Sequence, residues 1–284
     1  MKRFLQIEYL KIKGNNSFKV FSLIFVVFLP IIVILLPIIF KNGLLGPDTY
    51  PIMPRSASAS WYFTSYVASW FSLFILSFII IFHVTNEYAS KTVRQNIIDG
   101  YSKLDFLKSK VGMVLFMALV ATIYVFIVGL VAGVYFKANQ PAIVAMPIVP
   151  GIPTINSVAE FGGLFNGILF VLGFFLQVLA YFILAVMISV LLRKGALAVM
   201  VYFGVFLIEI FFVSQLDSQG MEGVANFFPL HAFSSLLPFF GFDALIFGMG
   251  EVEPLTLMNS IISIAYIALF ILITKYVFYK RDVV

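Results

Sequence analysis

The sequence predicts an all-α integral membrane protein with six transmembrane helices. Hydrophobic residues make up 62% of the 284 residues and charged residues only 11%, whereas about a quarter of a soluble domain is charged. The chain also holds six apolar runs, each near or above the ~20 residues that a helix needs to cross a bilayer. Because lipid offers no partner to backbone polar groups, these runs are predicted to be helical.

The six predicted spans occupy most of the chain, so we expect a single membrane domain over residues 1–284. The spans are residues 20–40, 61–85, 111–136, 161–192, 196–213 and 255–279. The fourth run is the longest and would reach about 48 Å at ~1.5 Å per residue. That length exceeds the hydrocarbon core, so this helix is expected to tilt or to begin outside the lipid.

The orientation follows from the distribution of basic residues between the loops. Fifteen of the 18 lysines and arginines fall on the side that holds both termini and the loop 86–110, and three fall on the other side. Because lysine and arginine remain preferentially in the cytoplasm, both termini and this loop are predicted to be cytoplasmic. We expect a multi-pass protein of the plasma (inner) membrane of a prokaryote.

Residues 227–250 form a further apolar stretch that is about long enough to cross the bilayer. A seventh crossing here would move the basic C-terminus to the outer side. Pro229, Pro238 and Gly241 would also interrupt a single helix. We therefore predict a re-entrant pair of short helices that enters from the outer face between spans five and six.

The longest polar passage is residues 86–110, between the second and third spans. An apolar residue recurs there at every fourth position, which places these residues on one stripe of a helix: they are Ala89, Val93, Ile97 and Tyr101. Gly100 is suited to end this helix. Ser102 and Asp105 have the spacing of a capping box that begins a second helix. The loop is thus predicted to be a structured helix-turn-helix elbow.

The pattern of this elbow leaves two interpretations. Its basic residues suit an amphipathic helix that lies on anionic lipid headgroups. The alternative is a docking element for a cytoplasmic partner. Lipid binding needs no defined turn, whereas a helix, turn and helix of fixed shape can fit a protein groove and transmit a push, so the turn favours docking.

The same stretch resembles the cytoplasmic loop of type-2 permeases of ATP-binding cassette (ABC) exporters. The residues that carry the resemblance are Glu87, Lys91-Thr92-Val93-Arg94, Gly100-Tyr101-Ser102-Lys103 and Lys110. Lys91 departs from the family pattern, which often has glycine before the threonine. The resemblance implies that 86–110 holds a coupling helix seated in a cleft of an ATPase subunit, and that residues 1–19 form a cytoplasmic interface helix.

The resemblance also implies the ATPase-coupling residues and the partners. The predicted coupling residues are Glu87, Lys91, Thr92, Arg94, Ile97, Gly100, Ser102, Lys103 and Lys110. Family members assemble from two permeases, identical or homologous, and two ATPase subunits that bind Mg-ATP. The sequence has no G-x-x-x-x-G-K-[ST] phosphate loop, so ATP hydrolysis is expected from the partner chain. Membrane lipid is the other expected partner, and nucleic acid is not expected.

Composition argues against chemistry within this chain. It has no cysteine and two histidines, which removes disulfides, thiolate nucleophiles and the usual metal-site spacings. We expect no catalytic residue, no cofactor and no metal. The resemblance implies ATP-driven export across the plasma membrane, and the aromatic-rich, nearly uncharged interior suggests an apolar or amphipathic substrate.

Four polar residues within or beside the spans are candidates for a substrate path or gate. They are Glu209, Gln177, Asn166 and His231. A carboxylate in a membrane span is costly and usually faces protein or water. Each also has a structural interpretation: Glu209 snorkels or pairs with a neighbouring helix, Gln177 and Asn166 join helices, and His231 is an ordinary buried polar group.

Two other function classes remain open at this level. A membrane scaffold or sensor could bind an ATPase through the same elbow without transporting anything. An ion-coupled secondary carrier usually has several charges at mid-membrane depth or paired broken helices, for which Glu209 alone is thin support.

Overall fold

The computed structural model describes residues 11, 14–39, 57–100, 102–139, 164–237 and 257–280. Over these residues the fold is helical, without strands, and six helices are long and apolar enough to cross a membrane. This confirms the prediction of a helical fold in the described part of the chain, with six helices of the length and apolar composition of membrane spans. The elements are α2 (Asn16–Ile39), α3 (Ala57–Phe71), η2 (Ser72–Leu76), α4 (Ser77–Ala89), α5 (Thr92–Ile98), α6 (Lys103–Asn139), α7 (Leu164–Leu192), α8 (Gly195–Ser218), α9 (Glu222–Ala225), α10 (Pro229–Ser234) and α12 (Leu257–Lys280).

The second span is one continuous rod made of α3, the π-helical turn η2 and α4. Serine hydroxyls satisfy backbone carbonyls around this wide turn: Ser72 donates to the Ala68 carbonyl at 2.8 Å, and Ser77 donates to the Ser72 carbonyl at 2.7 Å. Tyr202 of α8 in turn donates to the Ser77 hydroxyl at 3.1 Å. A π-turn inside an α-helix frequently marks a functional site.

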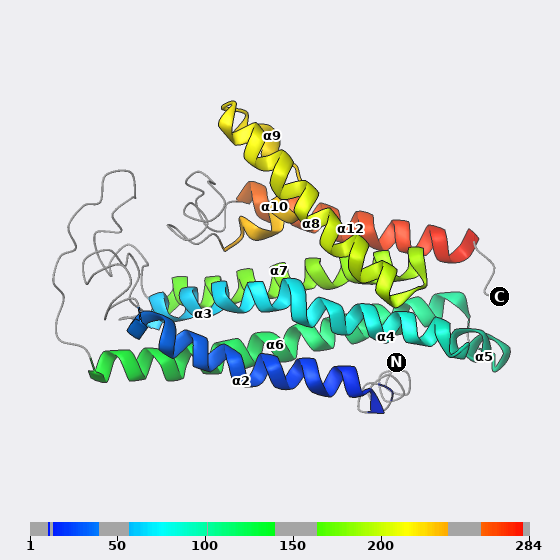
Figure 1. Cartoon of the computed structure of the whole chain (residues 1–284), viewed down its shortest axis with the longest axis horizontal. Helices are drawn as coiled ribbons and strands as arrows, with labels where there is room; N and C mark the ends of the chain where they lie inside the picture. The colour runs from blue at the N-terminus through cyan, green and yellow to red at the C-terminus, as the bar shows by residue number, and fades with distance from the viewer. Residues whose placement is uncertain are drawn as a thin grey trace.

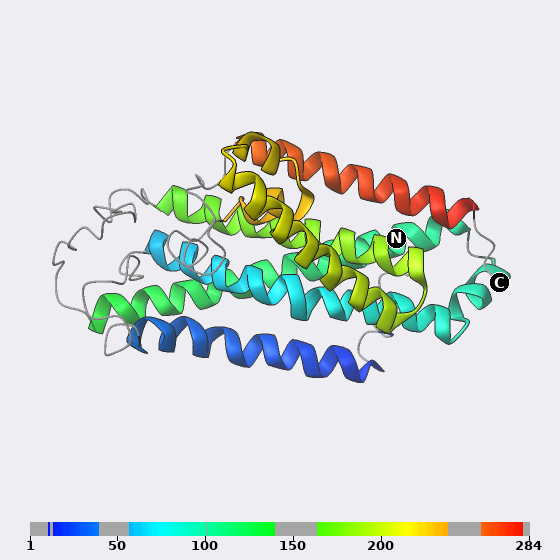
Figure 2. The ribbon, with the colours of Figure 1, turned by 45° about the horizontal axis from the view of Figure 1, so that its top comes forward.

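The second and fourth spans form the core of the bundle. In each of these two, 67% of the most apolar stretch is buried within the protein, against 17–33% in the other four. Helix α7 packs against α3, α4, α6 and α12, and Figures 1 and 2 show α2 at one side of the bundle with α12 at the other. The outer four spans therefore leave apolar faces for lipid or for another membrane chain.

Helix α5, the beginning of α2 and the end of α12 lie at the same end of the bundle (Figure 1). A hydrogen bond supports this arrangement, since Lys103 at the start of α6 donates to the Tyr279 carbonyl at 3.2 Å. Both ends of the six-helix path thus share one side with the elbow, as an even number of crossings requires.

At the opposite end, the chain turns back toward the bundle after α8. Pro229 stands in the first turn of α10, where its missing N–H costs nothing. Helix α10 packs against α7, α8 and α12. The later part of the predicted re-entrant segment 227–250, from residue 238, lies outside the described residues. So does most of the predicted interface helix, residues 1–10, 12 and 13.

Candidate functional site

The elbow between the second and third spans is built from two left-handed backbone positions. Lys91 has φ 57° between α4 and α5, and Gly100 has φ 95° after α5. Glycine adopts this conformation without steric cost, which fits the glycine predicted to end the first helix. It also accounts for the preference for glycine at the position of Lys91 in the family that the loop resembles.

The start of α6 is capped as the sequence predicts. The Asp105 backbone N–H donates to the Ser102 hydroxyl oxygen at 3.1 Å, and the Ser102 hydroxyl donates to the Asp105 carboxylate at 2.5 Å. A side chain that satisfies a free N–H in the first helical turn contributes about 1 kcal/mol. Residues 92–98 therefore form a short helix between two defined turns.

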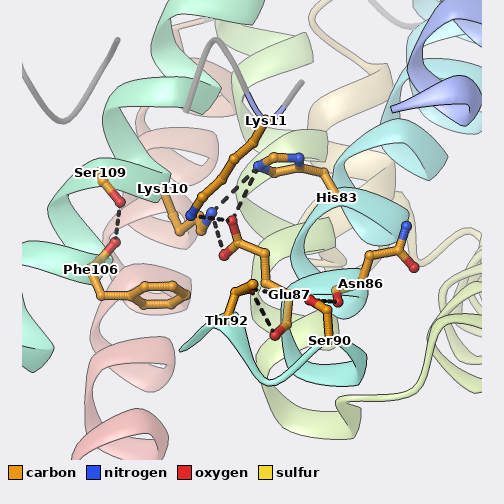
Figure 3. Close-up of polar contacts among 9 residues, drawn as sticks. All are labelled: Lys11, His83, Asn86, Glu87, Ser90, Thr92, Phe106, Ser109 and Lys110. Atoms are coloured by element: carbon orange, nitrogen blue, oxygen red, sulfur yellow. Dashed lines mark hydrogen bonds and ion pairs between the residues drawn. The ribbon is translucent and has the colours of Figure 1, made fainter. Parts of the chain in front are cut away.

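A buried ion cluster lies directly behind this elbow, centred on the Glu87 carboxylate (Figure 3). Lys110 Nζ lies 2.7 Å from Glu87 Oε2, and Lys11 Nζ lies 3.0 Å from Oε1. His83 Nε2 is 3.8 Å from the same Oε1 and 3.4 Å from Lys110 Nζ. Glu87 is only 5% exposed and Lys110 is 0% exposed, so this pair is removed from water.

The cluster connects four segments of the chain. Lys11 precedes α2, Glu87 belongs to α4 and Lys110 belongs to α6. The Lys110 ammonium also stands 5.1 Å from the centre of the Phe106 ring, and this ring stacks on Phe278 of α12 at 5.0 Å. Breaking a buried ion pair leaves an uncompensated charge. The cluster therefore fixes the elbow to the ends of four helices.

Helix α5 presents a different face outward. Val93 is 1% exposed and anchors the helix to the bundle, whereas Ile98 is 73% exposed. Arg94 and Gln95 are exposed beside Ile98, and positions four apart lie on one helical face. We call Arg94, Gln95 and Ile98 the outer face of α5. It combines a cation, an amide and an apolar side chain. Helix α5 itself lies at the tip of the bundle in both views (Figures 1 and 2).

The structure separates the predicted coupling residues into two groups. Glu87 and Lys110 are buried in the ion cluster, whereas the rest are exposed or half-buried around α5: they are Lys91, Thr92, Arg94, Ile97, Gly100, Ser102 and Lys103. Lys11 and His83 belong to the cluster but are not among the predicted coupling residues, and the exposure of Ile98 was likewise not predicted. The spacing of His83 and Glu87, four residues apart on one helix, was the available signal for His83.

Three of the four candidate path residues meet at one cavity among α3, α7, α8 and α10. Gln177, Glu209 and His231 line it, whereas Asn166 is a half-buried residue near the start of α7 and is absent from the lining. The cavity has about 60 Å³ of accessible space, which suffices for a few water molecules.

Hydrogen bonding at this cavity is incomplete. Glu209 Oε1 accepts a hydrogen bond from the His231 backbone N–H at 2.7 Å, and so caps α10 from a neighbouring helix. Gln177 Nε2 donates to the Tyr181 hydroxyl at 3.1 Å. Gln177 Oε1 and His231 Nδ1 have no hydrogen-bond partner among the described residues. Burial lowers the pKa of His231 to about 4, so its imidazole is neutral at pH 7.

No protein-family model, curated protein or solved structure matches this chain. In the described part of the chain, no group of three or more histidine, aspartate and glutamate side chains is placed to hold a metal ion. The likeness to ABC permeases therefore rests on the residues of 86–110.

Proposed function

We propose that this chain is the membrane-spanning subunit of an ATP-driven ABC exporter, and that α5 is the coupling helix that receives motion from a separate ATPase chain. The observation that carries the proposal is the contrast between the two sides of the elbow. Its outer face leaves Arg94, Gln95 and Ile98 exposed, while its inner side is fixed by the Glu87 ion cluster.

This construction suits a lever. A force on the outer face of α5 would pass through the Glu87–Lys110 pair into α4 and α6, because both partners are buried and their separation costs energy. The same cluster reaches the segment before α2 through Lys11. Motion of α5 is thereby coupled to the second and third spans and to the entry of the first.

The position of α5 also favours protein docking over lipid binding. The helix lies at the tip of the bundle, beyond the ends of α2 and α8 in both views (Figures 1 and 2). Ile98 is 73% exposed there, and together with the exposed Arg94 and Gln95 it offers a protein partner both apolar and polar contacts. Two such chains, identical or homologous, would present two elbows to two ATPase subunits, which would bind the Mg-ATP.

The proposal is tested by purifying the tagged full chain from membranes of its native host. An ATPase subunit is expected to co-purify and to hydrolyse Mg-ATP. Arg94→Ala combined with Ile98→Ala should reduce both the amount of bound ATPase and the hydrolysis. Lys194→Ala, which changes an exposed cation at the α7–α8 turn, is the matched control and should reduce neither. Unchanged assembly and hydrolysis in the double variant would refute the role of α5.

Transport is tested separately from docking. In sealed vesicles that contain the complex, ATP should drive movement of an amphipathic compound, and the α5 double variant should slow that movement. An assembled complex with coupled hydrolysis but no flux would identify a scaffold or sensor. Flux that persists without ATP and follows an ion gradient would identify a secondary carrier.

A further inference from the structure

The Glu209 carboxylate is buried in a cavity whose described lining holds no lysine or arginine. The side chain is 6% exposed in the apolar interior. The one histidine in that lining, His231, is neutral at pH 7 because burial lowers its pKa to about 4. A nearby positive charge favours the ionised form of a buried carboxyl group, so a cation bound in this cavity would be stabilised by the Glu209 carboxylate.

Other polar atoms in the cavity are also without partners. Gln177 is 1% exposed and its Oε1 has no hydrogen-bond donor in the described structure; His231 is 7% exposed and its Nδ1 is likewise unpartnered. Buried polar atoms normally have a hydrogen-bond partner from protein, water or a ligand. A carboxylate, an amide oxygen and a neutral imidazole together suit a ligand that donates hydrogen bonds and carries positive charge.

Aromatic rings supply much of the remaining wall. Four of them line the cavity: Tyr66, Trp70, Tyr181 and Phe206. Aromatic faces attract ammonium groups through the ring quadrupole. The π-helical turn contributes Leu73 to the same wall. The aromatic rings are therefore suited to a cationic head group, and the apolar side chains beside them are suited to the alkyl chain attached to it.

We propose that this cavity binds the ammonium head group of an amphipathic organic cation, with the head inside the cavity beside Glu209 and Gln177 and the alkyl tail extending out of it along the apolar helix surfaces. The idea that such cations are the exported substrate rests on the proposed export function. The binding of such a cation to the cavity concerns this chain alone and can be tested without an ATPase.

The probe is dodecylammonium, compared with neutral dodecanol of the same chain length. The purified full chain is placed in nanodiscs of zwitterionic lipid, and empty nanodiscs give the background. Trp70 lines the cavity and the chain has one other tryptophan, Trp61, so Trp61→Phe leaves a single reporter at the site. Saturable change in its emission is expected with dodecylammonium and not with dodecanol. In Trp70→Phe the signal should be lost.

Two substitutions identify the groups responsible. Glu209→Gln removes the charge but keeps an oxygen that can accept from the His231 N–H, and should weaken dodecylammonium binding by at least ~10-fold. Gln177→Leu removes the unpartnered oxygen and should weaken it by ~3–10-fold. Asn166→Leu changes a polar residue of the same helix outside the cavity lining and is the control. If Glu209→Gln fails to fold, Gln177→Leu decides.

Equal binding of dodecylammonium and dodecanol, or wild-type binding by Gln177→Leu and Glu209→Gln, would overturn the cation site. These results are independent of the ATPase. Charge-selective binding with no ATPase partner would leave the site intact and refute the export function. Coupled ATPase activity without charge selectivity would refute the site and leave the export function intact.

Discussion

Glu87 and Glu209 are two buried glutamates in one helical bundle, with opposite surroundings. Glu87 is 5% exposed and has two lysine ammonium groups within 3.0 Å of its carboxylate oxygens. Glu209 is 6% exposed and accepts a backbone N–H, with no lysine or arginine in the described lining of its cavity. Among the described residues, the same residue type is thus paired with lysine ammonium groups at one end of the protein and with backbone N–H near the other.

The different surroundings of Glu87 and Glu209 show that the burial of a glutamate does not by itself define its role. A compensated buried carboxylate connects segments and resists separation, which suits transmission of force from α5. A carboxylate with a short backbone contact and adjacent unpartnered atoms is suited to receive a ligand. We therefore propose that the Glu87 cluster serves coupling and that the Glu209 cavity serves cargo binding.

The largest expected effect comes from removing the closest partner of Glu87. Lys110→Ala leaves a buried carboxylate without its 2.7 Å partner and should lower the free energy of unfolding by about 3–5 kcal/mol. Denaturant titration of the purified chain in mixed micelles measures this loss. The control is Glu87→Gln combined with Lys110→Met, which removes both charges and should recover much of the stability. If Lys110→Ala were as stable as the wild type, the Glu87–Lys110 ion pair would not stabilise the fold.

A smaller loss is expected at the other glutamate. Glu209→Ala leaves the His231 N–H in the first turn of α10 without its acceptor and should cost about 1–3 kcal/mol. Glu209→Gln keeps an acceptor and should cost much less in the same titration. Equal losses in both variants would show that the charge, rather than the cap, stabilises α10.

The pH dependence of stability should distinguish the two regions further. Burial lowers the pKa of His231 from 6.5 to about 4, so between these values the unfolded chain binds a proton that the folded chain excludes. Stability should therefore fall as pH decreases from 6.5 toward 4 and be unaffected by this group above that window. In His231→Gln this part of the slope should disappear. A slope that is identical in both proteins would contradict the burial of a neutral imidazole.

The smallest effect is expected at the edge of the Glu87 cluster. The Lys11 side chain is 26% exposed, and ion pairs that remain in contact with water contribute about 0–1 kcal/mol. Lys11→Ala should therefore change stability far less than Lys110→Ala. A loss as large as that of Lys110→Ala would mean that the first segment, rather than α6, compensates Glu87.

The spans and the elbow could be predicted because their signals are local in the sequence. The length of an apolar run indicates a membrane helix, and the spacing of Ser102 and Asp105 predicts a capping box at the start of a helix. The inward direction of Glu87 and Lys110 could not be predicted in this way. Lys11 and Glu87 are 76 residues apart, and the turn at Lys91 shifts the helical phase between α4 and α5, so the stripe through Ala89 and Ile97 is not continuous.

The cavity was predictable only in its parts. Polar residues within apolar runs are costly in a membrane and often functional, and this makes Glu209 and Gln177 recognisable as candidates from the sequence. Their convergence with His231 depends on how α10 folds back against α7 and α8, which no local pattern records. The π-helical turn beside the cavity was likewise not predicted, because the serines that bond backbone carbonyls around it, Ser72 and Ser77, are equally compatible with an ordinary α-helix.

The central claim is that an ATPase subunit binds the outer face of α5. Cross-linking from a single introduced cysteine tests this claim most directly. The natural chain has no cysteine, so Ile98→Cys places a unique thiol on the outer face, and Ile97→Cys places one on the adjacent half-buried position. With a short bifunctional maleimide, and with an ATPase subunit that carries a cysteine in its docking cleft, Ile98→Cys should cross-link efficiently and Ile97→Cys weakly. Equal cross-linking at both positions, or none at Ile98→Cys in an assembled complex, would contradict the account.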